Sequence, residues 1–245
     1  MLGRQGFRYD QENTAVCYNS LGNIAQQNQD YKKSLEWYQK GLEKYKQVLP
    51  ANHDLIADSY RSVGAMHARI GNTDEALQSL ETALSILKTN HDEMHPLIAF
   101  CLHEIGNTYL QTKNIHDVSN IALEFLQKAL KIKQQVLPEN DRSIATTMLS
   151  IGSLYRALGQ FDEALTFYER SLEVKLNSLP KSHPTIIVNY HILSTVCQEK
   201  GDYERASKYA ELMTQSEFQS LTLKQPDCTG ITIHSFDGLS QNSDT

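Results

Sequence analysis

The chain has 245 residues, of which 40% are hydrophobic, and its 23 Lys and Arg against 29 Asp and Glu give a net charge of −6. With only 12 Gly and 6 Pro, this composition argues against a loop-rich or many-stranded fold and fits an all-helical one. The acidic balance offers no basic domain for phosphates, so we expect no nucleic-acid partner. No apolar run has membrane-spanning length and residues 1–11 lack the apolar core of a signal peptide, so we expect a cytoplasmic protein with no membrane partner.

Helical periodicity divides the chain into a lead, five similar units and a tail. Residues 1–13 are polar and unpatterned, and we expect a short flexible lead there. The units follow at about residues 14–53, 54–95, 96–141, 142–183 and 184–221, and each contains two amphipathic segments around a turn. Residues 222–245 lose the helical period and gain Pro, Gly, Ser and Asp, which predicts a disordered tail.

The fourth unit shows the pattern most clearly. Ile151, Gly152 and Tyr155 lie on one helical face, and a turn at residues 159–160 separates them from a second helix that begins at Phe161. Because neither helix can bury its apolar stripe alone, copies of the pair must stack on one another. The sequence therefore predicts a solenoid.

Two sets of small residues fix the repeat period. The first-helix set advances in steps of 42, 42, 46 and 42 residues, and the second-helix set in steps of 42, 46, 42 and 42. The first set is Gly22, Gly64, Gly106, Gly152 and Ser194, and the second is Ser34, Ala76, Ala122, Ala164 and Ala206. A four-residue insertion therefore lies between Gly106 and Ala122. Since it is close to one helical turn, it can lengthen the second helix without rotating its core face.

These patterns resemble the tetratricopeptide repeat, and the 42-residue period resembles its kinesin-light-chain subclass. The connectors between units carry this resemblance: LPANHDLIA (49–57), HDEMHPLIA (91–99), LPENDRSIA (137–145) and LPKSHPTII (179–187). The resemblance implies a right-handed superhelical, all-α solenoid of five helix pairs. It also implies that the first helix of each pair lines a concave face where ligands bind.

No pattern of residues predicts a catalytic or metal site. His53, His95 and His183 share one repeat position, but residues a whole repeat apart cannot converge on one ion, and we expect them in inter-repeat turns. The cysteines have no C-x-x-C spacing, and we expect Cys17, Cys101 and Cys197 to be reduced core residues. No phosphate-binding loop or nucleophile elbow is present, so we expect no enzyme activity, cofactor or bound metal.

The expected binding surface is the concave face, where the resemblance places polar side chains at i, i+4 and nearby positions. Amide and guanidinium groups there would suit a peptide backbone and acidic side chains, although the same residues could form an ordinary solvated helix face. The candidate groove residues are Asn19, Asn23, Gln27, Arg61, Arg69, His103, Asn107, Gln111, Ser153, Arg156, His191, Thr195 and Gln198.

The sequence thus predicts a non-catalytic scaffold or adaptor that binds a protein or peptide partner, with acidic residues expected in that partner. Two other interpretations stay open. The chain could be the repeat portion of a larger assembly, either a kinesin-light-chain-like cargo adaptor of a motor or an enzyme whose catalytic domain lies elsewhere. Alternatively, the groove could serve self-association.

Overall fold

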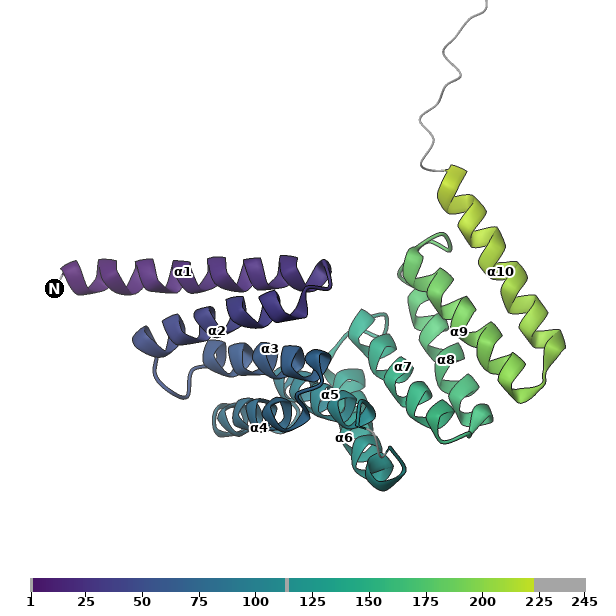
Figure 1. Ribbon diagram of the computed structural model, residues 1–245, viewed down its shortest axis with the longest axis horizontal. Coiled ribbons are helices and arrows are strands. Elements are labelled where there is room, and N and C mark those ends of the chain that lie inside the picture. Colours follow the sequence, from purple (N-terminus) through teal and green to yellow (C-terminus); the bar gives the residue numbers. More distant parts are fainter. Residues whose placement is uncertain (1, 113–114, 223–245) are drawn as a thin grey trace, which may run out of the picture.

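The protein is an all-helical array in which ten helices follow one another, as seen in a computed structural model that describes residues 2–112 and 115–222 (Figure 1). No strand occurs within those two ranges. The helices are α1 (Leu2–Gln27), α2 (Tyr31–Val48), α3 (Asp54–Ile70), α4 (Thr73–Asn90), α5 (Pro96–Leu110), α6 (Ile115–Val136), α7 (Arg142–Ala157), α8 (Phe161–Leu176), α9 (Pro184–Lys200) and α10 (Tyr203–Thr222).

Successive helices form five hairpins, α1–α2 through α9–α10, and each hairpin packs on the next. We call the odd-numbered helices helices A and the even-numbered helices B. Helix A of one hairpin also touches helix A of the next in the middle of the array, where α3 contacts α5 and α5 contacts α7. Helices A therefore lie together along one side of the solenoid, as the resemblance implied.

The first-helix glycines explain how the two helices of a pair come close. A Cβ added at Gly152 would lie 2.8 Å from Cε1 of Tyr168, and one at Gly64 would lie 2.7 Å from Cγ of Leu80. In each case the contact is with a large helix-B side chain sixteen positions later. In the fifth pair the helix-A residue is the larger of the two: Ser194 occupies the position of the glycine, and Ala210 occupies the position of the large helix-B side chain. The predicted register of small residues is confirmed by these contacts.

Side chains in the connectors cap the N-termini of helices α3, α5, α7 and α9. The Nδ1 atoms of His53, His95 and His183 accept hydrogen bonds of 3.1–3.3 Å from the backbone N–H two residues later. Asp141 does the same for α7, with a distance of 2.7 Å to the backbone nitrogen of Ser143. These residues cap helix N-termini and satisfy donors that would otherwise have no partner. The expected position of the histidines in inter-repeat turns is confirmed.

The four-residue insertion lengthens α6 at its start. Ala122 is the eighth residue of α6, whereas its equivalents Ala76 and Ala164 are the fourth residues of α4 and α8. The added turn leaves Ala122 fully buried, as Ala76 and Ala164 are. The prediction that the insertion extends helix B without disturbing its core face is confirmed.

Two expectations differ from the structure, and one lies outside it. Residues 2–13 are not a separate lead, because α1 begins at Leu2 and no proline interrupts the helix before Gln27. Cys17 is exposed and is not a core residue, unlike Cys101 and Cys197, because it lies beside Val16 on an exposed face of α1. The tail falls almost wholly on residues 223–245, outside the described residues. The division into units at residues 53, 95, 141 and 183 stays a prediction.

Candidate functional site

The side of the solenoid formed by helices A carries the thirteen residues that the sequence predicted for the groove. We call this side the inner face. Their exposure varies, because some project outward and others pack between helices. His103 is buried, and Asn19, Arg61, Asn107, Arg156 and Thr195 are half-buried; the exposed members are Asn23, Gln27, Arg69, Gln111, Ser153, His191 and Gln198.

Two of the three predicted cations are already paired. On α3, the Nη2 and Nε atoms of Arg61 donate to Oδ1 of Asp58 over 2.6 and 3.0 Å. Arg156 on α7 donates from Nε and Nη2 to the two carboxylate oxygens of Glu199 on α9, over 2.8 and 2.5 Å. The hydrogen bonds from Arg156 lower the pKa of the Glu199 carboxyl. The expectation that Arg61 and Arg156 present free guanidinium groups to acidic side chains of a partner is therefore wrong.

His103 is also wrong as a surface contact, since its side chain is only 6% exposed and lies between α5 and α7. Its Nε2 lies 2.9 Å from Nδ2 of Asn107, and its Nδ1 lies 3.2 Å from Oγ1 of Thr147. The Thr147 hydroxyl donates its one proton to the Ser143 carbonyl over 2.8 Å, so it accepts from His103. His103 is therefore neutral with the proton on Nδ1, and burial lowers its pKa to about 3.

Lys133 on α6 completes this buried network. Its Nζ donates to Oγ1 of Thr147 over 2.9 Å and to the Ser143 carbonyl over 3.3 Å, and it lies 4.9 Å from the ring centroid of Phe100. The side chain is 1% exposed, and burial lowers its pKa to about 8. Sequence reasoning missed this residue, although a lysine at a position that Tyr45 and Leu87 hold in the first two repeats was the available signal.

Two inner-face residues have a structural role in addition to any binding role. The Tyr38 hydroxyl donates to Oδ1 of Asn23 over 2.6 Å, and the Tyr168 hydroxyl donates to Oγ of Ser153 over 3.1 Å. Both tyrosines are the large helix-B residues that pack on the small-residue positions. Asn19 turns toward α2, where its Oδ1 is buried and, among the described residues, accepts no hydrogen bond.

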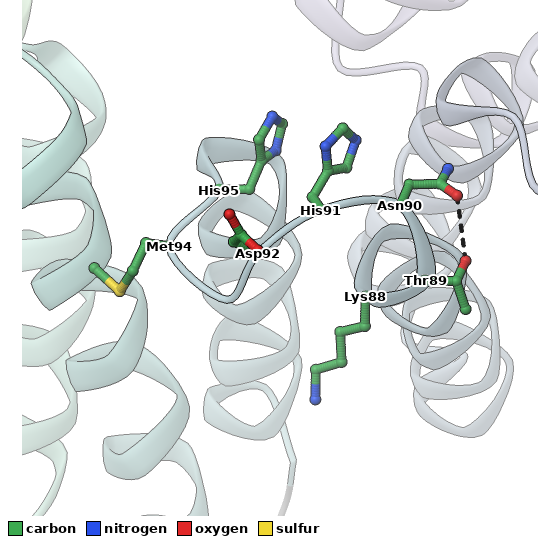
Figure 2. Close-up of a pocket in the computed structure, with 7 residues that line it drawn as sticks. All are labelled: Lys88, Thr89, Asn90, His91, Asp92, Met94 and His95. Atoms are coloured by element: carbon green, nitrogen blue, oxygen red, sulfur yellow. Dashed lines mark hydrogen bonds between the residues drawn. The ribbon is translucent and has the colours of Figure 1, made fainter.

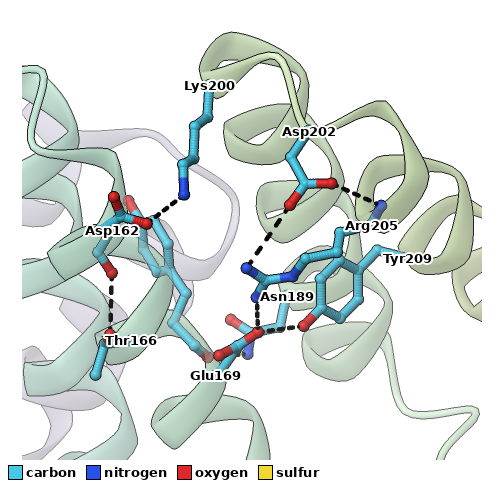
Figure 3. Close-up of polar contacts among 9 residues, drawn as sticks. Asp162, Thr166, Glu169, Asn189, Lys200, Asp202, Arg205 and Tyr209 are labelled. Carbon is cyan, nitrogen blue, oxygen red and sulfur yellow. Dashed lines mark hydrogen bonds and ion pairs between the residues drawn. The ribbon is translucent and has the colours of Figure 1, made fainter.

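At the C-terminal end, polar contacts join three helices (Figure 3). Glu169 on α8 pairs with Arg205 on α10 and accepts a hydrogen bond of 2.5 Å from the Tyr209 hydroxyl. Burial, followed by the bond to Glu169, raises the pKa of Tyr209 to about 12. Lys200 at the end of α9 pairs with Asp162 at the start of α8. These contacts lie between repeats and tie the last two hairpins together.

A hollow of about 570 Å³ lies at the α4–α5 connector (Figure 2). The rings of His91 and His95 stack there with centroids 3.7 Å apart, and Nε2 of His91 lies 2.7 Å from Oδ2 of Asp54. The end of α4 and the connector after it supply the lining, and Asn90 and His91 there bond to the preceding connector and to the start of α3. Within the described ranges, no group of three or more His, Cys, Asp or Glu could hold a metal ion. The hollow is therefore a feature of the turn between the second and third repeats.

Neither cysteine of the core is suited to nucleophilic chemistry. Burial raises the pKa of the Cys101 thiol to about 12, and burial also raises that of Cys197. A thiol that stays protonated at neutral pH is a poor nucleophile. Across the helices that the structure describes, none is long and apolar enough to cross a membrane.

Similar proteins share this architecture. Protein KINESIN LIGHT CHAIN-RELATED 2 of Arabidopsis thaliana is 24% identical over 147 residues, which are 59% of this chain and 21% of that protein. The crystal structure of a Podosopora anserina putative kinesin light chain with nearly identical TPR-like repeats has a TM-score of 0.64 at 20% identity, covering 86% of this chain and 97% of that one. A Rap protein complexed with Competence and Sporulation Factor has a TM-score of 0.70 at 17% identity, covering 86% and 57%.

The chain spans about a fifth to a quarter of the length of the curated relatives it matches. The profile described as tetratricopeptide repeat matches residues 10–89, 55–135, 119–177 and 143–212, which together cover most of the sequence. Fold, period and family match therefore agree, and the chain belongs to the tetratricopeptide repeat family, in its kinesin-light-chain-like type.

Proposed function

We propose that this protein is a non-catalytic scaffold that binds a peptide segment of a partner protein along its inner face, in the cytoplasm. The family is in general an interaction fold, and the family model that matches the chain indicates no catalytic activity. The observation that carries the peptide proposal is the row of exposed polar side chains along helices A. Gln27 on α1, Gln111 at the C-cap of α5 and Gln198 on α9 belong to this row.

An extended or short helical peptide suits this surface better than a small molecule does. The exposed groups are spread over five helices, so a single small ligand could not touch most of them. Amide side chains can donate to and accept from peptide groups whatever the peptide sequence. The Rap protein of similar fold is complexed with Competence and Sporulation Factor, which is compatible with ligand binding by such a solenoid.

The test compares two variants with the same chemical change. The inner variant carries Gln27→Glu, Gln111→Glu and Gln198→Glu; the outer variant carries Gln39→Glu, Gln127→Glu and Gln135→Glu on helices B, where all three side chains are exposed. Peptides would be selected from a displayed random library on the parent protein, and their affinities measured for both variants. Melting temperatures and far-ultraviolet circular dichroism would show that both variants keep the fold.

We expect the inner variant to weaken the selected peptides at least tenfold and the outer variant to leave them nearly unchanged. Acidic peptides should lose most, because the three new carboxylates repel them. If the outer variant alone loses binding, the inner face is not the binding surface. If no peptide is selected on the folded parent protein, the proposal of peptide binding fails.

A further inference from the structure

An unfilled cavity lies between α7 and α9 on the inner face, and it contains a buried lysine without a strong partner. The cavity has a volume of about 270 Å³. Apolar side chains provide much of its wall, and the two cations that line it are accompanied by no acidic residue. Its lining residues are Arg142, Thr146, Leu149, Lys175, Leu179, Pro184, Thr185 and Val188.

The cavity belongs to the same helix faces as the predicted groove. On α7, Thr146 and Leu149 precede Ser153 and Arg156 at steps of three and four residues, which places them on one side of the helix. Val188 has the same relation to His191 on α9. Val188 is 55% exposed, so it adds accessible apolar surface to the cavity lining. This site therefore rests on, and deepens, the proposed function of the inner face.

Lys175 is the group that needs a ligand. It is 8% exposed, and its Nζ reaches the Thr185 carbonyl at 3.5 Å, a long hydrogen bond. Among the described residues, no carboxylate forms an ion pair with it. Burial, followed by the charge of Arg142, lowers the pKa of Lys175 to about 8. An anion that enters the cavity would stabilise the charged form of this buried lysine.

The preceding junction shows what is missing here. Lys133 stands at the repeat position of Lys175, 42 residues earlier, and it is covered by the Phe100 ring and bound by Thr147. The residue equivalent to Phe100 in the next unit is Thr146, 46 residues later, which is too small to cover a lysine.

The equivalent of Thr147 also fails to reach Lys175. This residue is Asn189, whose Nδ2 donates to the Tyr168 carbonyl over 3.1 Å. The α7–α9 cavity is thus the space that a ring and a hydroxyl occupy between α5 and α7. A ligand that supplies an apolar side chain and an oxygen acceptor would restore both contacts.

We propose that this cavity binds the C-terminal residue of a partner peptide, with an aromatic or bulky aliphatic side chain against Leu149, Leu179 and Val188. The α-carboxylate pairs with Lys175 and Arg142. A C-terminal residue fits because the ammonium and the apolar wall share one small cavity. The ligand must therefore present a carboxylate and an apolar group on the same Cα. The guanidinium of Arg142, at the exposed start of α7, can bind a carboxylate with two hydrogen bonds.

The experiment uses N-acetylphenylalanine as the probe and N-acetylphenylalaninamide as its uncharged match. Methyl resonances of Leu149, Leu179 and Val188 would be followed by nuclear magnetic resonance while each probe is titrated into the whole protein. We expect saturable shifts at these methyls with the acid and at least tenfold weaker binding of the amide. Equal binding of the two probes, or shifts confined to other regions, would overturn the proposal.

Thr146→Phe is the decisive variant, because it copies the ring that covers Lys133. It should fill the cavity, keep the melting temperature at or above that of the parent, and abolish probe binding. Lys175→Met should also abolish binding of the acid while it retains the fold. If the folded Thr146→Phe protein binds the acid as tightly as the parent, the cavity is not the site.

A third probe separates a C-terminal carboxylate from an internal acidic side chain. N-acetyl-Phe-Asp-amide carries a ring and a carboxylate on neighbouring residues, and we expect it to bind at least tenfold more weakly than N-acetylphenylalanine. Equal or tighter binding would overturn the C-terminal assignment. If library peptides respond to the inner Gln→Glu variant but not to Thr146→Phe or Lys175→Met, the proposed function stands and this subsite is wrong.

Discussion

Replacing Gly152 with leucine tests the packing that sets the spacing of the fourth helix pair. The first added atom alone would lie 2.8 Å from Cε1 and 2.9 Å from Cδ1 of Tyr168, closer than carbon atoms approach in folded proteins. Tyr168 cannot swing away easily, because it is 1% exposed and its hydroxyl is bonded to Ser153. The two helices must therefore separate, or the ring must leave its preferred rotamer.

The expected cost follows from two opposing effects. Overpacking of a filled core costs about 1–3 kcal/mol, and sometimes more. The helix propensity of leucine is better than that of glycine by about 1 kcal/mol or slightly less, which offsets part of that cost. Because the new leucine side chain would carry three further carbon atoms beyond the clashing one, we expect an overpacking cost near the upper end of that range and a net loss of about 2 kcal/mol.

Thermal unfolding followed by far-ultraviolet circular dichroism measures this change, at roughly 2–4 °C per kcal/mol for a chain of this size. Ala157→Leu on the same helix is the control, since Ala157 is exposed and the substitution should be nearly neutral. Gly152→Leu combined with Tyr168→Ala should cost less than the sum of the two single losses, because the second substitution removes the clashing ring. An unchanged melting temperature for Gly152→Leu would refute the assigned close approach of α7 and α8.

Three further predictions concern buried or paired charges. The pKa of His103 in the folded protein is about 3 against an ordinary 6.5, so its contribution to stability is present above pH 6.5 and is lost as the pH falls toward 3. The variant His103→Leu, which carries the residue found at the equivalent position 149, should therefore lose stability less steeply than the parent protein between pH 6.5 and 4 in denaturant titrations. Lys175→Met should raise the melting temperature more than Lys133→Met, because the Lys133 ammonium has two hydrogen bonds and a ring contact that the variant loses; the reverse order would contradict the view that Lys175 lacks a strong partner. Glu199→Gln should destabilise the protein by only about 0.2–1 kcal/mol, less in high salt, because its ion pair with Arg156 is more than a third exposed on both sides; a salt-independent loss in chemical denaturation would point to packing instead.

Much of the fold was predictable from the sequence because the determinants of each hairpin are local and recur. The small residues at positions such as Gly64 and Gly152 recur at the spacing of the units, and a Cβ added at either of these two would clash with a helix-B residue sixteen positions later. Periodicity alone therefore fixed the helix pairs, their order and the lengthened α6. The same logic failed at the N-terminus, where polar residues continue α1 without any apolar signal.

The candidate site was only partly predictable, because it depends on contacts between repeats. Helical spacing placed Arg156 and His103 on helices A, but it could not show that Glu199 neutralises the arginine or that Thr147 encloses the histidine. These two partners lie 43 and 44 residues away along the chain, a separation at which a one-dimensional pattern does not encode contact. The lack of a covering ring at Lys175 is likewise a property of the tertiary structure. The change from Phe100 to Thr146 matters only because each residue lies next to a buried lysine, one between α5 and α7 and the other between α7 and α9.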